Sequence, residues 1–499
     1  MSKTKSKDYF NTDHLKANLK QRSVRGGAIT IAAQSSKFGL KFGSTIVLAR
    51  LLVPEDYGLI GMATVVIGFV EYFKDLGLST ATIQRREINH QQISTLFWIN
   101  IAVACLVALI VALLAPAVAS FYNEPRLQKI TLVLAINFIF GGLTVQHQAL
   151  LRRQMQYVSL AKVEIASMFM GVATSVVAAY YGLNYWALVL MLVATTLTNA
   201  IGVWLACSWR PGLPRRNCDV GSMLAYGSNI TGFGLVNYFS RNLDNILIGR
   251  RWGSQELGLY AQAYKLVLLP IQQINTPVTS VALPSLSSLQ SEPQEYCRYY
   301  YKAMLSIAAL GMPTIGFLFA FADQVILVVL GEQWLATVPI FKLLMPAALN
   351  ATVGVGLGWA YQSLGNVNRQ LRWGIGSSIV NAILFIIGVR WGAMGVAAAF
   401  GLSRPLFFLV GFAYCYDQTP LKLTQLLAHL RFPVIASMGA VVILTSTSLF
   451  TFFLDNPYLS LLIDLGFYVL FYFLIWILLP NGKKTLWAML RLTKILRPK

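Results

Sequence analysis

Charged side chains are scarce in this chain, and acidic ones are scarcer than basic ones. Of its 499 residues, 12% are charged and 56% are hydrophobic, whereas a soluble domain carries about 25% charged residues. Asp and Glu total 19 against 40 Lys and Arg, which gives a net charge of +21. The basic residues gather in the two tails and between apolar runs, a pattern that orients membrane helices rather than one that binds nucleic acid. The sequence therefore predicts a membrane protein with no nucleic-acid partner.

Histidine and cysteine are also few, with 4 and 5 residues respectively. They are scattered along the chain and show no spacing that suits a zinc site. The chain also lacks a glycine-rich phosphate loop and a nucleophile elbow. No loop on the predicted outer side exceeds about a dozen residues, which leaves no room for an external catalytic domain. We therefore expect a transporter rather than an enzyme, with no catalytic residue, no metal site and no cofactor.

Long apolar runs are what the sequence has in abundance. Each run of about 20 residues can cross a hydrocarbon core of about 30 Å as a helix. We therefore predict an all-α polytopic membrane protein with about fourteen transmembrane helices. The shorter stretch 323–335 is expected to form a short interfacial helix. The predicted spans are 28–50, 57–78, 93–115, 128–150, 160–181, 184–207, 224–249, 258–283, 302–322, 335–363, 372–390, 393–416, 432–454 and 458–480.

The longest break between these runs is a basic loop that contains proline and glycine, and it divides the predicted helices into six and eight. Loops on one side of the membrane, together with both tails, carry most of the Lys and Arg, so we predict that both termini are cytoplasmic. The expected organisation is a basic tail (1–27), an N-terminal bundle of helices 1–6 (28–207), a cytoplasmic loop (208–223), a C-terminal bundle of helices 7–12 (224–416), helices 13–14 (432–480) and a second basic tail (481–499).

Two segments 200 residues apart resemble each other. Residues 46–63 read IVLARLLVPEDYGLIGMA, and residues 246–263 read ILIGRRWGSQELGLYAQA. Each ends one apolar helix, makes a polar turn and starts the next helix. Both turns fall on the predicted outer side, so the repeat is parallel and relates the two six-helix bundles by a pseudo-two-fold axis along the membrane normal. The matched positions include Ile46 and Ile246, Arg50 and Arg250, Gly58 and Gly258, Leu59 and Leu259, and Ala63 and Ala263.

Ionisable residues within the predicted spans are the candidates for function, because a charge in the membrane is costly unless it faces a cavity or a partner. Lys37 and Lys41 lie four residues apart on one face of the first helix. The repeat offset pairs Lys41 with Arg241, and Lys265 lies in the eighth helix. For Lys37 and Lys41, which lie deep in the first helix, we favour a position facing a cavity. The charge within the predicted spans is mostly basic, and a cavity of that sign suits a phosphate or pyrophosphate.

Other charges have a structural alternative. Asp244 lies on the same helix face as Arg241, so it either pairs with that arginine or takes part in ion coupling. Glu71 and Asp75 flank Lys74 in the second helix and have the same two alternatives, of which pairing near a helix end is favoured. Glu164 accompanies Lys162 in the fifth helix. Lys162 and Arg404 are expected to lie near cytoplasmic helix ends and to extend toward water.

Three stretches of sequence resemble a known family. They are LARLLVPEDYGLIGMA followed by FKDLGLSTATIQRREI, NYFSRNLDNILIGRRWGSQELGLYAQAYKLVLLP, and PVTSVALPSLSSLQ. The chain is similar over about 25–480 to polysaccharide transporters (Wzx-type, colanic-acid exporter-like) of the multidrug/oligosaccharidyl-lipid/polysaccharide (MOP) flippase superfamily. The resemblance implies a bacterial inner-membrane flippase that moves undecaprenyl-pyrophosphate-linked oligosaccharide repeat units from the cytoplasmic to the periplasmic leaflet by alternating access. It implies that Lys37, Lys41, Arg241 and Lys265 line a central cationic cavity that binds the substrate. It also implies contact with membrane lipids, and with a polysaccharide polymerase and glycosyltransferases of the same pathway as partners.

Two other functions remain open at this point. A drug or cation antiporter of the same superfamily should offer buried carboxylates, whereas the deep charges here are mostly basic. A membrane-embedded polysaccharide polymerase or ligase would need a large external loop with catalytic residues, and no such loop is present.

Overall fold

The protein is described here from a computed structural model. The structure describes residues 9–10, 19–75, 78–85, 88–214, 221–446 and 456–486. Side chains at 19–31, 69–78, 81, 84, 221–237 and 239–240 lie outside this description, as does the basic tail beyond residue 486. The described residues form helices and no strand, which confirms the predicted all-α class.

The chain divides into two compact units, Met1–Gly258 and Leu259–Lys499. The division reflects which residues contact each other and does not test the predicted bundle boundaries. The boundaries at 207, 224 and 416 therefore stay predictions. The first unit contains α2 (Leu19–Leu51), α3 (Pro54–Asp75), α4 (Leu78–Gln84), α5 (His90–Tyr122), α6 (Arg126–Arg153), α7 (Tyr157–Tyr180) and α8 (Tyr185–Ala206), together with the first part of α9 (Gly221–Ser288).

The second unit contains the rest of α9. Its further helices are α10 (Pro293–Ala320), α11 (Ala322–Val329), the 3-10 helix η1 (Glu332–Thr337), α12 (Val338–Ser363), α13 (Val367–Gly388), the 3-10 helix η2 (Val389–Trp391), α14 (Gly392–Tyr416), α15 (Leu423–Ser446) and α16 (Pro457–Leu478). The stretch 323–335, expected as a short interfacial helix, forms α11 and the start of η1. Its position relative to a membrane stays a prediction.

Ten helical segments in the described ranges are long and apolar enough to cross a membrane. One of these segments, Val367–Tyr416, contains both α13 and α14. The number of fourteen transmembrane helices therefore stays a prediction. Where the predicted spans fall on described residues, they lie largely within helices of the structure.

Local sequence explains where individual helices begin and end. At the start of α5, the Asn89 side chain accepts a hydrogen bond from Gln92 N–H at 2.8 Å, and Asn89 N–H donates to the Gln92 side chain at 3.1 Å. This reciprocal pair is a capping box, which satisfies two backbone donors at a helix start. The same helix ends at Tyr122 and is followed by the capping residue Asn123, whose φ of 54° lies in the left-handed region that asparagine tolerates.

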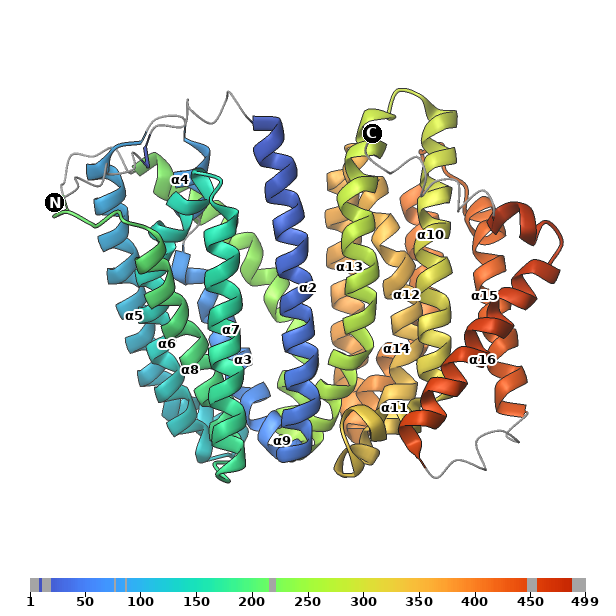
Figure 1. Cartoon of the computed structure of the whole chain (residues 1–499), viewed down its shortest axis with the longest axis horizontal. Helices are drawn as coiled ribbons and strands as arrows, with labels where there is room; N and C mark the ends of the chain where they lie inside the picture. Colours follow the sequence, from blue (N-terminus) through green and yellow to red (C-terminus); the bar gives the residue numbers. More distant parts are fainter. Residues whose placement is uncertain are drawn as a thin grey trace. The chain divides into compact units, whose positions relative to one another are not determined.

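The helices of the first unit pack mainly as sequential neighbours. Helix α5 lies against α6, α7 lies against α8, and α6 also contacts α8 (Figure 1). Helix α2, which carries Lys37 and Lys41, packs along α7. Short connections between successive helices favour this antiparallel arrangement.

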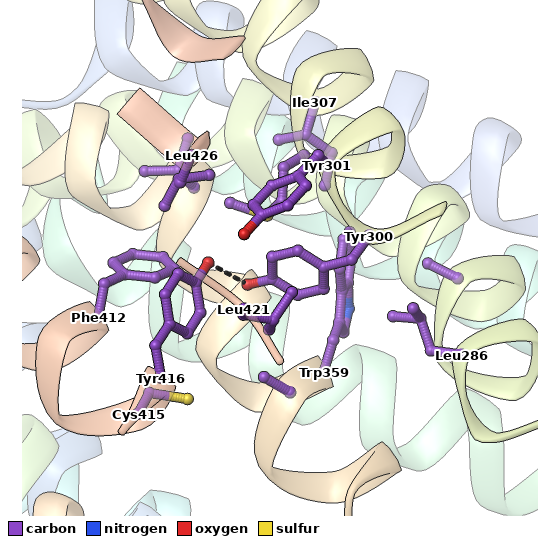
Figure 2. Close-up of a cluster of buried hydrophobic side chains, with 14 of the residues drawn as sticks. Leu286, Tyr300, Tyr301, Ile307, Trp359, Phe412, Cys415, Tyr416, Leu421 and Leu426 are labelled. Carbon is purple, nitrogen blue, oxygen red and sulfur yellow. Dashed lines mark hydrogen bonds between the residues drawn. The ribbon is translucent and has the colours of Figure 1, made fainter. Parts of the chain in front are cut away.

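The second unit has an aromatic core where α10, α12, α14 and α15 meet. Tyr300 of α10 and Tyr416 of α14 face each other in Figure 2, and the Tyr416 hydroxyl donates to the Tyr300 hydroxyl at 3.0 Å. Trp359 of α12 lies edge-on to Tyr300, and all three side chains are buried. The bonded hydroxyls allow two tyrosines to occupy an apolar core without unpaired polar atoms.

Candidate functional site

The structure gives Lys37 a carboxylate partner on another helix. Its Nζ lies 2.6 Å from Oε2 of Glu164, so a salt bridge joins α2 to α7. The side chains are 24% and 38% exposed. The sequence placed Glu164 beside Lys162, but Lys162 is exposed. Lys37 therefore brings less free positive charge to the first unit than the sequence suggested.

Lys41 and Arg241 occupy equivalent positions of the repeat, and both side chains are exposed. Among the described residues, neither makes an ion pair with a carboxylate. Lys41 lies on α2, one turn beyond Lys37, and Arg241 lies on α9 in the same compact unit. Of the predicted site residues, these two offer the most available positive charge.

The remaining predicted site residues are placed differently. Asp244 is 5% exposed and accepts a hydrogen bond from Asn245 N–H at 2.8 Å. Lys265 is half-buried and belongs to the second unit, so a cavity shared with the other three cations stays a prediction. The side chains of Glu71 and Asp75 lie outside the described part of the structure, and their predicted roles are untested.

The repeated turns approach each other closely within the first unit. A Cβ atom added to Gly58 would lie 1.7 Å from the backbone oxygen of Ser254, and one added to Gly258 would lie 1.8 Å from that of Pro54. Positions 54 and 254 are themselves a repeat pair, so the two contacts are reciprocal. A two-fold relation produces this pattern: position 58 of the first copy meets position 254 of the second, and position 258 of the second meets position 54 of the first. The paired Gly-Leu motif is therefore a packing element, in which only glycine fits.

Charged groups fix the first of these turns. Arg126 at the start of α6 pairs with Glu124, whose Oε1 lies 2.7 Å from Arg126 Nε, and with Glu55 at the start of α3. The hydrogen bond from Arg126 holds the pKa of the Glu124 carboxyl below its ordinary value. Asp56 is buried, and its Oδ2 accepts from Val53 N–H at 3.1 Å. The acidic residues of the motif thus serve the turn and the helix start.

Sequence reasoning misplaced Arg404. It was expected to extend to water near a helix end, but it lies midway along α14 and is 8% exposed. It lines a pocket of about 130 Å³ in the second unit with Tyr264, Asn350 and Phe400. The missed signal is the spacing of its neighbours, because Phe400 and Phe407 lie four before and three after it and therefore flank it on the same helix face.

Comparison with known proteins places the chain in a family. Residues 47–339 match the family model described as polysaccharide biosynthesis protein. The chain belongs to this family. It is 24% identical over 394 residues to the lipopolysaccharide biosynthesis protein WzxC of Escherichia coli (strain K12), which covers 78% of this chain and 79% of WzxC. It is also 27% identical over 346 residues to the teichuronic acid biosynthesis protein TuaB of Bacillus subtilis (strain 168). This match covers 69% of this chain and 72% of TuaB.

Solved structures share the fold of this polysaccharide biosynthesis family member. The lipid II flippase MurJ in its inward closed conformation matches with a TM-score of 0.71 at 13% identity, over 90% of this chain and 97% of MurJ. An inward-facing multidrug resistance MATE family transporter of the MOP superfamily matches with a TM-score of 0.60 at 14% identity. This match covers 77% of this chain and 94% of the transporter. The chain is a multi-pass membrane protein that shares its fold with these two structures.

Proposed function

We propose that this protein is a flippase that moves undecaprenyl-pyrophosphate-linked polysaccharide repeat units from the cytoplasmic to the periplasmic leaflet. The observation that carries the proposal is membership of the polysaccharide biosynthesis family. The MurJ-like fold supports it, since MurJ is named as a flippase of lipid II. Fold alone does not determine substrate, so the substrate class rests on the family and on the charge of the site.

The cations of the first unit suit an anionic head group. Lys41 and Arg241 are exposed and make no ion pair with a described carboxylate, so a pyrophosphate would not have to displace an existing partner. Arg offers a planar fork to phosphate oxygens, and Lys offers a point charge with rotatable donors. In this mechanism the pyrophosphate binds in the cationic cavity while the polyprenyl tail stays in the lipid. Lys37, whose charge is shared with Glu164, and Lys265 are the secondary members of the cavity.

Alternating access requires the two six-helix bundles to move relative to each other. The kink in α9 at Gly253, with φ 83°, and the three prolines inside the helix allow this segment to bend. The proposed location is the bacterial inner membrane with both termini cytoplasmic, as the basic loops and tails favour. A polymerase and glycosyltransferases of the same pathway are the proposed partners.

A drug or cation antiporter is the second candidate, because a multidrug MATE transporter shares the fold. Such a transporter needs a carboxylate that exchanges protons or cations, and Asp244 is a buried acidic group in the first unit. The two functions differ in what a deletion strain accumulates. Loss of the flippase leaves lipid-linked repeat units in the cell, whereas loss of an antiporter leaves polysaccharide export intact and raises drug sensitivity.

Complementation of such a strain tests the proposed site. Lys41→Ala and Arg241→Ala should each abolish polymer export while the protein reaches the membrane at normal levels. Lys162→Ala is the matched control, since Lys162 is an exposed cation of the same unit outside the proposed cavity, and it should export normally. Lys41→Arg should restore export in part because it keeps the charge. Normal export by both alanine variants would contradict the assignment of these two cations.

A further inference from the structure

A buried arginine in the second unit has no acidic partner among the described residues. Arg404 lies midway along α14, about 18 Å from either end of the helix at 1.5 Å per residue. It is 8% exposed. Four other partly exposed cations each have a carboxylate within ion-pair distance: Lys37, Arg126, Lys342 and Arg369. Arg404 differs from them in being more buried and in having only neutral contacts.

These neutral contacts position the guanidinium without neutralising it. Arg404 Nε donates to the Phe400 carbonyl oxygen at 3.0 Å, and Nη2 donates to Oδ1 of Asn381 on α13. The rings of Phe400 and Phe407 lie 4.1 and 4.3 Å from Cζ, so aromatic faces contact the charge. Nη1 has no hydrogen-bond partner within the described part of the chain. A membrane-embedded charge held in this way usually serves a ligand or a pathway.

A pocket beside Arg404 has room for a small group such as a carboxylate or phosphate. Its volume of about 130 Å³ exceeds what a few waters need. Asn350 of α12 also lines this pocket, and most of the other lining residues are apolar or aromatic. An oxyanion in this pocket would meet a guanidinium fork and an amide in surroundings of low dielectric, where charge-assisted hydrogen bonds are strong.

We propose that the Arg404 pocket is an oxyanion subsite, in which Arg404 and Asn350 bind a carboxylate or phosphate group of the transported lipid-linked saccharide. This inference rests on the proposed flippase function and adds a second anionic contact, separate from Lys41 and Arg241. The oxyanion supplies the counter-charge that no described residue provides at Arg404. Two sources share this chemistry: the carboxylate of an acidic sugar and the phosphate of the lipid head group.

Thermal unfolding of the purified full-length protein with small probes tests the subsite. The probes are sodium glucuronate for the sugar carboxylate and sodium phosphate for the head group, with glucose and sodium chloride as controls at matched ionic strength. One of the two anions should raise Tm by several degrees because it binds the folded state only, and the responding anion identifies the source. Arg404→Gln should lose the shift. Arg298→Gln, which removes an exposed cation paired with Glu295, should keep it.

Asn350→Asp provides a test that does not depend on how well Arg404→Gln folds. The new carboxylate lies in the pocket with Arg404 and supplies the missing partner, so this variant should have a higher Tm than the wild type and no response to either anion. A response in Asn350→Asp equal to that of the wild type, or no response of the wild type to either probe, would overturn the subsite. Anion binding that depends on Arg404, in a protein whose deletion leaves polysaccharide export intact, would refute the flippase proposal while retaining the subsite.

Discussion

Replacing Gly58 with alanine tests the reciprocal contact between the repeated turns. The added Cβ would lie 1.7 Å from the Ser254 oxygen and 2.4 Å from its carbonyl carbon. Both atoms belong to the backbone, so no side chain can rotate to relieve the clash. Because non-bonded atoms keep a van der Waals distance of about 3 Å, one helix must move by more than 1 Å to accommodate the Cβ. Overpacking of this kind costs about 1–3 kcal/mol.

Helix propensity acts in the opposite direction, since alanine in a helix interior is favoured over glycine by about 1 kcal/mol. The matched control is Gly43→Ala in α2, where an added Cβ meets nothing within 4 Å. Gly43→Ala should therefore leave the protein as stable or more stable, and Gly58→Ala should destabilise it. At about 2–4 °C per kcal/mol, the two variants should differ in Tm by several degrees.

The measurement is thermal unfolding of the purified protein in detergent, followed by tryptophan fluorescence. Gly258→Ala should behave like Gly58→Ala, because its Cβ would lie 1.8 Å from the Pro54 oxygen. The double variant should cost less than the sum of the single variants, since the first substitution already separates the same two helices. Equal Tm values for Gly58→Ala and Gly43→Ala would refute the close approach of the two turns.

Two further predictions concern hydrogen bonds and charge within single units. Tyr416→Phe removes the hydroxyl that donates to the buried Tyr300 hydroxyl, and it should destabilise the protein by about 1–2 kcal/mol in the same unfolding assay. The control Tyr180→Phe changes an exposed tyrosine and should leave Tm nearly unchanged. Arg126 lowers the pKa of Glu124, so Glu124 stabilises the folded state above its ordinary pKa of 4.5 and loses this contribution as the pH falls through the lowered value. The Tm difference between the wild type and Glu124→Gln should therefore shrink on acidification below that pH, and a constant difference would contradict the role of the pair.

Local sequence predicted most of the fold because hydropathy and turn residues act over short distances. The apolar runs located the helices, and the polar residues of 50–56 located the break between α2 and α3. The break in α9 at Gly253 falls within the second copy of the repeat and between the two spans predicted at 224–249 and 258–283. The number of transmembrane helices and the orientation in the membrane depend on the lipid, and they stay predictions.

The site was less predictable because its contacts join distant parts of the chain. Lys37 pairs with Glu164, which is 127 residues away, and no local pattern gives such a partner. The approach of Gly58 to Ser254 likewise depends on how two helices cross, although the repeat did indicate which positions are equivalent. Arg404 was misjudged for a different reason: its flanking phenylalanines are visible in the sequence, but its burial depends on Asn381 of α13 and on packing within the second unit.

The central claim is that this chain moves a lipid-linked oligosaccharide between leaflets with Lys41 and Arg241 as head-group ligands. The most direct measurement uses the purified protein in proteoliposomes that contain an undecaprenyl-pyrophosphate-linked oligosaccharide, with an impermeant lectin reporting the glycan on the outer leaflet. We expect the wild type and Lys162→Ala to exchange glycan between leaflets and Lys41→Ala and Arg241→Ala to fail. Exchange by the wild type no faster than in protein-free vesicles would contradict the account.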